Sequence, residues 1–261
     1  MTDHAAMFSG AAAAAYDRFV GRYSPQLAAA LCDAAGIEAG QRALDVGCGS
    51  GALAAELARR LSAENVTGID PSEPFVEAAQ SRVPGARIVV GSAEALPFED
   101  DEFDATLSQL VVNFLTDPDQ GLSEMVRVTR AGGVVTGCVW DYRGEMTMLR
   151  SFWDAAAAFD PEAADEGASM RFATPDELRE LWAGAGLAQV GVTPLVVEAS
   201  YDDFDDLWQP FTTGVGPAGS YAASLEPEGQ AALRDEFARR LDSPQGAFTL
   251  SARAWCAVGR V

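Results

Sequence analysis

The residues best suited to hold a ligand form a glycine-rich turn at positions 44–51, with the sequence Leu-Asp-Val-Gly-Cys-Gly-Ser-Gly. Gly47, Gly49 and Gly51 stand at alternate positions, and glycine accepts a positive φ and a close ligand. The turn follows a short apolar segment and precedes leucines at every fourth position, which mark one face of a helix. Such strand–turn–helix junctions lie at the edge where α/β sheets bind ligands. The turn therefore predicts a ligand site.

The acidic residue Asp45 distinguishes between two possible ligands of this turn. The pattern Gly47-x-Gly49-x-x-Ala52 satisfies the loose dinucleotide fingerprint, and Asp70, about 20 residues further on, could bind a ribose. Asp45 precedes the first glycine by two residues, where a carboxylate would repel a pyrophosphate and attract an ammonium group. S-adenosylmethionine carries an ammonium, a sulfonium and a carboxylate but no phosphate. The sequence therefore favours S-adenosylmethionine over a dinucleotide.

The same residues resemble those of the class I S-adenosylmethionine-dependent methyltransferases. Asp45-x-Gly47-x-Gly49-x-Gly51 is similar to their first motif, and Gly68-Ile-Asp70 to their ribose-binding acidic residue. Segment 91–98 resembles the loop around the adenine, and 127–133 the glycine turn before the fifth strand. The resemblance covers about residues 40 to 140. It is greatest to the ubiquinone- and menaquinone-biosynthesis branch, known as type 11.

The resemblance implies that S-adenosyl-L-methionine is the cofactor and assigns its contacts. Asp45 and Gly47 would hold the methionine end, Asp70 the ribose hydroxyls, and Ala93 the adenine through its backbone. Arg22 would bind the cofactor carboxylate. The predicted cofactor residues are Tyr16, Arg22, Asp45, Gly47, Gly49, Gly51, Asp70, Ser92, Ala93, Glu94 and Gln109.

Several of these assignments have a structural alternative. Asp70 could cap the following helix, and Glu94 could be a solvated helix-cap residue. Gln109 could be an ordinary loop residue after the fourth strand. Tyr16 and Arg22 could belong to a packed helix face. The sequence alone leaves these alternatives open.

The sequence also departs from the family pattern. Ser92 stands where this branch often has an acidic residue for the adenine amino group, so that contact is weaker or comes from the backbone. Asn113 stands where a histidine is frequent, and a mechanism that uses the histidine as a base does not transfer. The sequence names no catalytic residue.

Aromatic residues after the fifth strand and in a late insertion are candidates for the acceptor pocket. They are Trp140, Trp208, Phe211 and Tyr221. Their alternative is ordinary core packing. Because the methyl group of a sulfonium is already activated, alignment and exclusion of water can supply most of the catalysis.

Composition excludes several other classes of function. The net charge is −21, which opposes binding to nucleic acid and to anionic membranes. The chain has no lysine, and its one histidine is His4, so lysine chemistry and serine–histidine catalysis are excluded. The four cysteines lack metal-ligand spacing, and no metal is predicted. No segment has the length of a membrane helix, and we expect a cytoplasmic protein.

The elements that must position these residues alternate between strand and helix. Strands are expected at 42–46, 66–69, 87–90, 104–108, 134–139, 190–199 and 248–258, with helices between most of them. This order predicts the α/β class: a doubly wound, seven-stranded, mostly parallel sheet in a Rossmann-like fold. Residues 1–261 would form one domain, with a helical N-terminal cap at 1–39, a cofactor-binding core at 40–140 and a lid at 202–245.

The predicted function is methyl transfer to a small molecule such as a quinone-like compound, a polyketide or another natural product. The alternative is a fold that binds S-adenosylmethionine without methylating and acts as a lyase or cyclase. The sequence does not indicate whether O, N or C is methylated, nor the oligomeric state.

Overall fold

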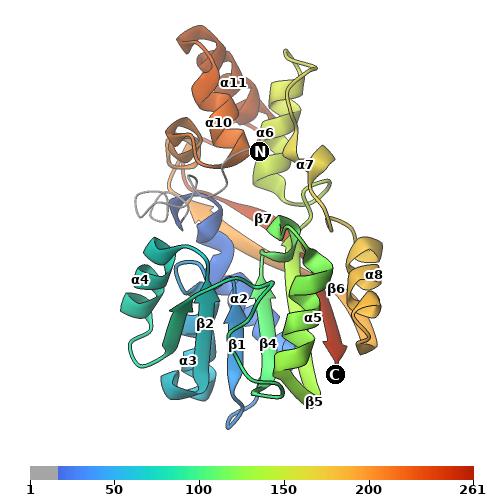
Figure 1. Ribbon diagram of the computed structural model, residues 1–261. Coiled ribbons are helices and arrows are strands. Elements are labelled where there is room, and N and C mark those ends of the chain that lie inside the picture. The colour runs from blue at the N-terminus through green and yellow to red at the C-terminus, as the bar shows by residue number, and fades with distance from the viewer. Residues whose placement is uncertain (1–16) are drawn as a thin grey trace.

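A seven-stranded sheet forms the centre of the computed structural model, which describes residues 17–261 (Figure 1). Its strands run in the order β3-β2-β1-β4-β5-β7-β6. They are β1 (Ala43–Val46), β2 (Val66–Asp70), β3 (Arg87–Val90), β4 (Phe103–Gln109), β5 (Thr129–Trp140), β6 (Ala188–Tyr201) and β7 (Phe248–Arg260). β7 runs antiparallel to both β5 and β6, and all the other neighbouring pairs are parallel. The predicted mostly parallel sheet is confirmed.

Helices cover the sheet on both faces. They are α2 (Ser24–Ala35), α3 (Ala52–Leu61), α4 (Glu73–Arg82), α5 (Pro118–Val128) and α8 (Pro175–Gly184). Helix α5 lies in front of the sheet in Figure 1 and α2 behind it. Helix α8 begins as its sequence predicts, because Thr174 and Glu177 form a capping box. None of the helices within residues 17–261 is long and apolar enough to span a bilayer.

A second group of helices lies beyond the carboxyl ends of the strands, and we call it the cap. It consists of α6 (Thr147–Ala157) and α7 (Glu166–Ser169) from the β5–α8 connection, with α9 (Phe204–Trp208), η5 (Gln209–Thr213), α10 (Gly216–Ser224) and α11 (Pro227–Arg240). The last four fill the segment 202–245 between β6 and β7. Short 3-10 turns complete the fold as η2 (Val20–Tyr23), η3 (Ala63–Asn65) and η4 (Val112–Phe114). The sequence patterns had not predicted α6 and α7.

Aromatic rings form the core of the cap. Phe211 is fully buried and stacks on Phe152, with 4.5 Å between ring centroids and 12° between planes. Phe237 and Phe19 meet the Phe211 ring edge-on at 5.3 and 4.7 Å. Trp208 lies against the same ring at 6.1 Å. This packing favours the core alternative for Phe211 and Trp208 over an open acceptor pocket.

Tyr221 lies at the margin of this cluster. Its ring is 5.5 Å from that of Trp153, and its hydroxyl donates to Asp160 Oδ2 at 2.9 Å. The Tyr221 ring therefore packs at the edge of the cluster, and its hydroxyl makes its hydrogen bond outside the cluster. For Tyr221, too, the geometry favours packing.

Replacing Phe211 by Ala should destabilise the protein strongly, because the ring is enclosed by other rings. We expect a loss of about 3–5 kcal/mol in the free energy of unfolding, measured by urea denaturation. Phe159→Ala is the matched control, since Phe159 is 44% exposed and should change stability by less than about 1 kcal/mol. Equal losses for the two variants would contradict this description of the cap core.

Candidate functional site

The glycine turn between β1 and α3 has a backbone that only glycine adopts easily. Gly47, Gly49 and Gly51 have φ values of 73°, 50° and 86°. A Cβ atom at Gly47 would collide with the side chain of Val111, and one at Gly51 would lie 3.0 Å from Ala79 Cα. All three glycines thus meet a conformational requirement, and Gly47 and Gly51 meet a steric one as well.

Asp70, the last residue of β2, ties this turn to the neighbouring strand. Its Oδ2 accepts a hydrogen bond from the Gly49 N–H at 2.9 Å, and its Oδ1 accepts one from the Ser72 N–H at 2.9 Å. Burial raises the pKa of the Asp70 carboxyl, which is 7% exposed. The N-cap position of α4 belongs to Ser72, so Asp70 precedes the cap and positions the glycine turn.

Asp45, on β1, is an acid enclosed within the protein. Its side chain is fully buried, and neither carboxylate oxygen accepts a hydrogen bond of normal geometry from the described residues. Burial raises the pKa of this carboxyl to about 8, although the nearby Ala54 N–H in the first turn of α3 opposes the rise and the Asp70 charge adds to it. A positively charged group of a ligand would stabilise the ionised form of this buried, unpaired carboxyl.

The buried polar atoms that lack partners identify the site. Within the described residues they are Asp45 Oδ1 and Oδ2, Ser108 Oγ, Gln109 Oε1, Asn113 Oδ1 and Trp140 Nε1. All of them lie near the carboxyl ends of β1, β4 and β5 or in η4, which follows β4. Each unpaired buried group costs about 1–3 kcal/mol, so native proteins keep few of them. Their concentration at one sheet edge indicates a place where a ligand completes the hydrogen bonding.

The loop after β3 lies beside this edge. The Gly91 N–H donates to the Asp70 carbonyl at 3.0 Å, which brings residues 91–94 next to Asp70. Ala93 is buried, and Ser92 is exposed with its Oγ accepting from the Glu94 N–H at 3.2 Å. Glu94 Oε1 accepts from the N–H of Asp117, the N-cap residue of α5, at 2.9 Å. For Glu94 the geometry favours the helix-cap alternative.

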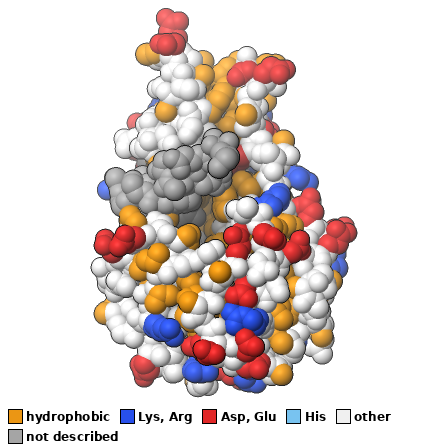
Figure 2. All heavy atoms as spheres, viewed as in Figure 1, with side chains coloured by type: hydrophobic (Ala, Val, Ile, Leu, Met, Phe, Trp, Pro, Cys, Tyr) orange, Lys and Arg blue, Asp and Glu red, His pale blue; other side chains and the backbone are white. Residues whose placement is uncertain are grey.

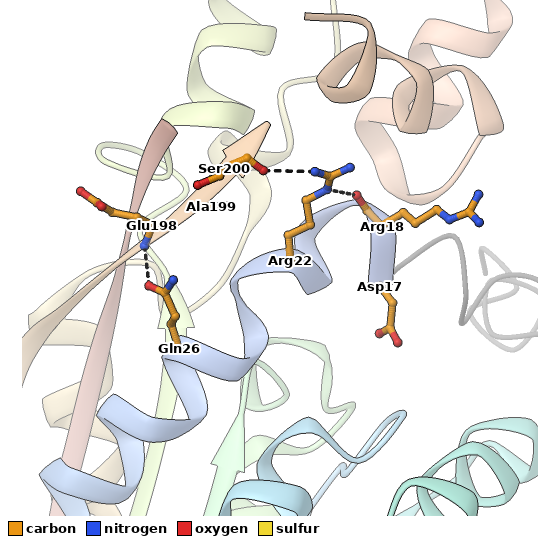
Figure 3. Close-up of a pocket in the computed structure, with 7 residues that line it drawn as sticks. All are labelled: Asp17, Arg18, Arg22, Gln26, Glu198, Ala199 and Ser200. Carbon is orange, nitrogen blue, oxygen red and sulfur yellow. Dashed lines mark hydrogen bonds between the residues drawn. The ribbon is translucent and has the colours of Figure 1, made fainter. Parts of the chain in front are cut away.

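Arg22 lines a cavity together with Ala52, the residue that follows the glycine turn, but its guanidinium is engaged elsewhere. Its guanidinium pairs with Asp206 of α9 and donates to the carbonyls of Ser200 and Arg18 at 3.2 and 2.8 Å. Figure 3 shows Arg22 in a groove between the N-terminal helical segment and the end of β6. In this structure its cation joins the two segments, and binding of the cofactor carboxylate by Arg22 stays a prediction. Tyr16 lies outside the described residues.

Gln109 and Trp140 are both brought to the site. Gln109 ends β4 and donates from Nε2 to the Ser24 carbonyl at 3.3 Å, with its Oε1 left unpaired. Trp140 ends β5 and is 2% exposed.

Ser108, also at this edge, was not singled out in the sequence. Its position in the last residues of a predicted parallel strand was the signal available.

The acidic character predicted from composition is visible at the surface. On the face drawn in Figure 2, the arginines lie among Asp and Glu side chains. Arg127, for example, is paired with both Glu124 and Asp100. Paired arginines offer little charge to a phosphate backbone.

Comparison with known proteins decides the family. A model of the methyltransferase domain matches residues 44–136. A demethylmenaquinone methyltransferase of Roseiflexus castenholzii is 34% identical over 164 residues, which cover 57% of this chain and 68% of that protein. The chain belongs to the class I S-adenosylmethionine-dependent methyltransferases. It is therefore an S-adenosylmethionine-dependent methyltransferase of the type 11 branch, and S-adenosyl-L-methionine is its cofactor.

A further relative and a solved structure are also similar to the chain. The chloroplastic 2-methyl-6-phytyl-1,4-hydroquinone methyltransferase 2 of Oryza sativa is 39% identical over 95 residues, which cover 36% of this chain and 27% of the rice protein. The structure of Haemonchus contortus phosphoethanolamine N-methyltransferase 2 with S-adenosyl-L-methionine superposes with a TM-score of 0.60 at 18% identity. That likeness covers 97% of this chain and 57% of that methyltransferase, and it shows the shared fold.

The burial of Asp45 predicts that cofactor binding is coupled to a proton. In the free methyltransferase the carboxyl is protonated below about pH 8, whereas pairing with an ammonium group requires the carboxylate. Binding of S-adenosylhomocysteine at pH 7 should therefore release up to about one proton, and affinity should rise with pH up to about 8. Calorimetry in buffers of different ionisation enthalpy measures this release.

Asp45→Asn is the matched variant, because it keeps the shape of the side chain and removes its titration. We expect this variant to bind S-adenosylhomocysteine more weakly than the wild-type protein and without the proton release linked to Asp45. Equal proton release by the two proteins would show that another group is responsible.

Proposed function

We propose that this methyltransferase transfers the methyl group of S-adenosylmethionine to a small aromatic acceptor of the hydroquinone type. The observation that carries the proposal is the set of unpaired polar atoms at the carboxyl ends of β1, β4 and β5. The acceptor class is supported by two relatives, which are named for demethylmenaquinone and for a 1,4-hydroquinone.

The residues present fit the cofactor. The unpaired Asp45 carboxylate would receive its ammonium group, and the left-handed turn at Gly47, Gly49 and Gly51 would let its methionine end approach the backbone. Each Asp70 oxygen already accepts one N–H and has a second lone pair for a ribose hydroxyl. The backbone at Ala93 would face the adenine.

The cofactor, when bound, supplies a methyl group activated by a sulfonium. The protein residues then have to hold the two reactants in line and keep water away. Asp45 and Asp70 fix the two ends of the cofactor, and the buried edge of β4 and β5 positions the acceptor. Fixed geometry, without a named catalytic base, accounts for most of the expected acceleration.

A labelled-methyl assay tests the proposed acceptor class. We expect label from S-adenosylmethionine to appear on 2-prenyl-1,4-naphthohydroquinone under anaerobic conditions, identified by mass spectrometry. The oxidised quinone is the matched control and should accept no methyl group, because its ring is electron-poor. Label on a different acceptor class, or product formation without methyl transfer, would overturn the proposal, and the second result would indicate the lyase or cyclase alternative.

Asp70→Asn tests the assignment of the ribose site. The variant keeps the shape of the side chain but loses charge-assisted hydrogen bonds, so the Kd for S-adenosylmethionine should rise about ten- to hundredfold. Asp104→Asn is a matched control, because Asp104 also accepts a backbone N–H, from Arg42, at the opposite end of a strand. Equal effects of the two substitutions on the Kd would contradict the assignment.

A further inference from the structure

We infer that Trp140 is a specificity-determining residue whose indole N–H donates a hydrogen bond to an oxygen atom of the acceptor. The inference rests on the proposed function and deepens it, because it specifies an acceptor atom that this chain would recognise. It begins from the fact that Trp140 Nε1 is buried and has no partner among the described residues.

Strand register places Trp140 in a row with two other unpaired groups. Asp45 of β1 pairs with Leu107 of β4, and Gln109 of β4 pairs with Cys138 of β5. Paired residues in a parallel sheet share a face, and so do residues two apart on one strand. Asp45, Gln109 and Trp140 therefore project from the same face of the sheet.

The row runs diagonally across three adjacent strands. Gln109 lies two residues beyond the partner of Asp45, and Trp140 lies two residues beyond the partner of Gln109. Strands are about 4.8 Å apart and rise about 3.3 Å per residue, so each step spans roughly 8 Å between Cα atoms. This spacing suits a cofactor amine near Asp45 and an acceptor near Trp140, with Gln109 between them.

The hydrogen-bonding character of the groups also differs along the row. The hydrogen bond from Gln109 Nε2 to the Ser24 carbonyl fixes the amide so that its oxygen is the free atom. That oxygen only accepts, whereas the indole of Trp140 only donates. An acceptor molecule at this end therefore needs an oxygen for Trp140 and a hydroxyl for Gln109. The two oxygens of a hydroquinone can supply both.

The neighbours of Trp140 hold its ring in place. Tyr23 of η2 meets the indole edge-on, with 5.7 Å between centroids and 73° between planes. The Tyr23 hydroxyl pairs with that of Tyr201 at 3.3 Å and so is already engaged. The indole is thus fixed by packing, and its N–H has no partner among the described residues.

Trp140→Phe removes the N–H and keeps an aromatic ring against Tyr23. Trp182→Phe is the matched control, because the buried Trp182 Nε1 donates to the Val135 carbonyl at 3.1 Å, a bond within the fold. Calorimetry would measure the binding of 2-prenyl-1,4-naphthohydroquinone to the protein saturated with S-adenosylhomocysteine. We expect Trp140→Phe to raise the Kd of this probe about tenfold or more and Trp182→Phe to leave it unchanged. The Kd of S-adenosylhomocysteine should change little in either variant.

The indole N–H signals provide a second measurement on the unaltered protein. The chain has five tryptophans, and the signal absent from Trp140→Phe identifies Trp140 in an ¹H–¹⁵N spectrum. We expect that signal to move downfield when the probe binds. An unchanged signal at saturation, or an unchanged probe Kd in Trp140→Phe, would overturn the inference and leave the proposed function intact. If the wild-type protein neither binds nor methylates the probe, the proposed acceptor class is wrong and the inference fails with it.

Discussion

The hydrogen bond from the Gly49 N–H to the Asp70 carboxylate is the contact on which the site depends. It joins the turn after β1 to the end of β2, and the Asp70 carboxylate is fixed at the same time by the Ser72 N–H. With the turn held there, the start of α3 and the buried Asp45 come to the same sheet edge. A charged acceptor with two backbone donors can impose this geometry more firmly than a neutral pair.

Contacts between the cap and the rest of the fold differ in strength. Arg22 and Asp206 form an ion pair whose side chains are 23% and 30% exposed, and such pairs contribute up to about 1 kcal/mol. Phe19 and Phe211, in contrast, are both buried and meet at 4.7 Å. Burial of aromatic rings is worth several times more than a half-exposed ion pair. The cap is therefore held mainly by its aromatic core, and Arg22 adds orientation.

Much of the fold could be predicted from local sequence patterns. The glycine turn, the strand ending at Asp70 and the capping box at Thr174 are encoded within a few residues each, and the structure has all three. Helix α6 was missed because it takes its position from a partner far along the chain, α11. Helix α7 was missed because it is a single turn of four residues, Glu166–Ser169, too short for a periodic pattern.

The site was predictable only in part. Asp45 was singled out by its place two residues before the first glycine, and Gln109 by its place after the fourth strand. The partner of Arg22 lies 184 residues away, and no local pattern reveals it. Likewise, periodicity cannot distinguish an aromatic ring that lines a pocket from one that fills a core. Phe211 belongs to the core of the cap because the rings of Phe152 and Phe237, from two other helices, pack against it.

Hydrogen exchange with mass spectrometry tests the central claim, that the ligand completes the unpaired edge of β1, β4 and β5. S-adenosylhomocysteine should slow exchange in the backbone of residues 46–53, 70–73, 91–95 and 109–113, with little change in α8 or β6. Slowed exchange confined to the groove between the N-terminal helical segment and the end of β6, with the glycine turn unchanged, would contradict it.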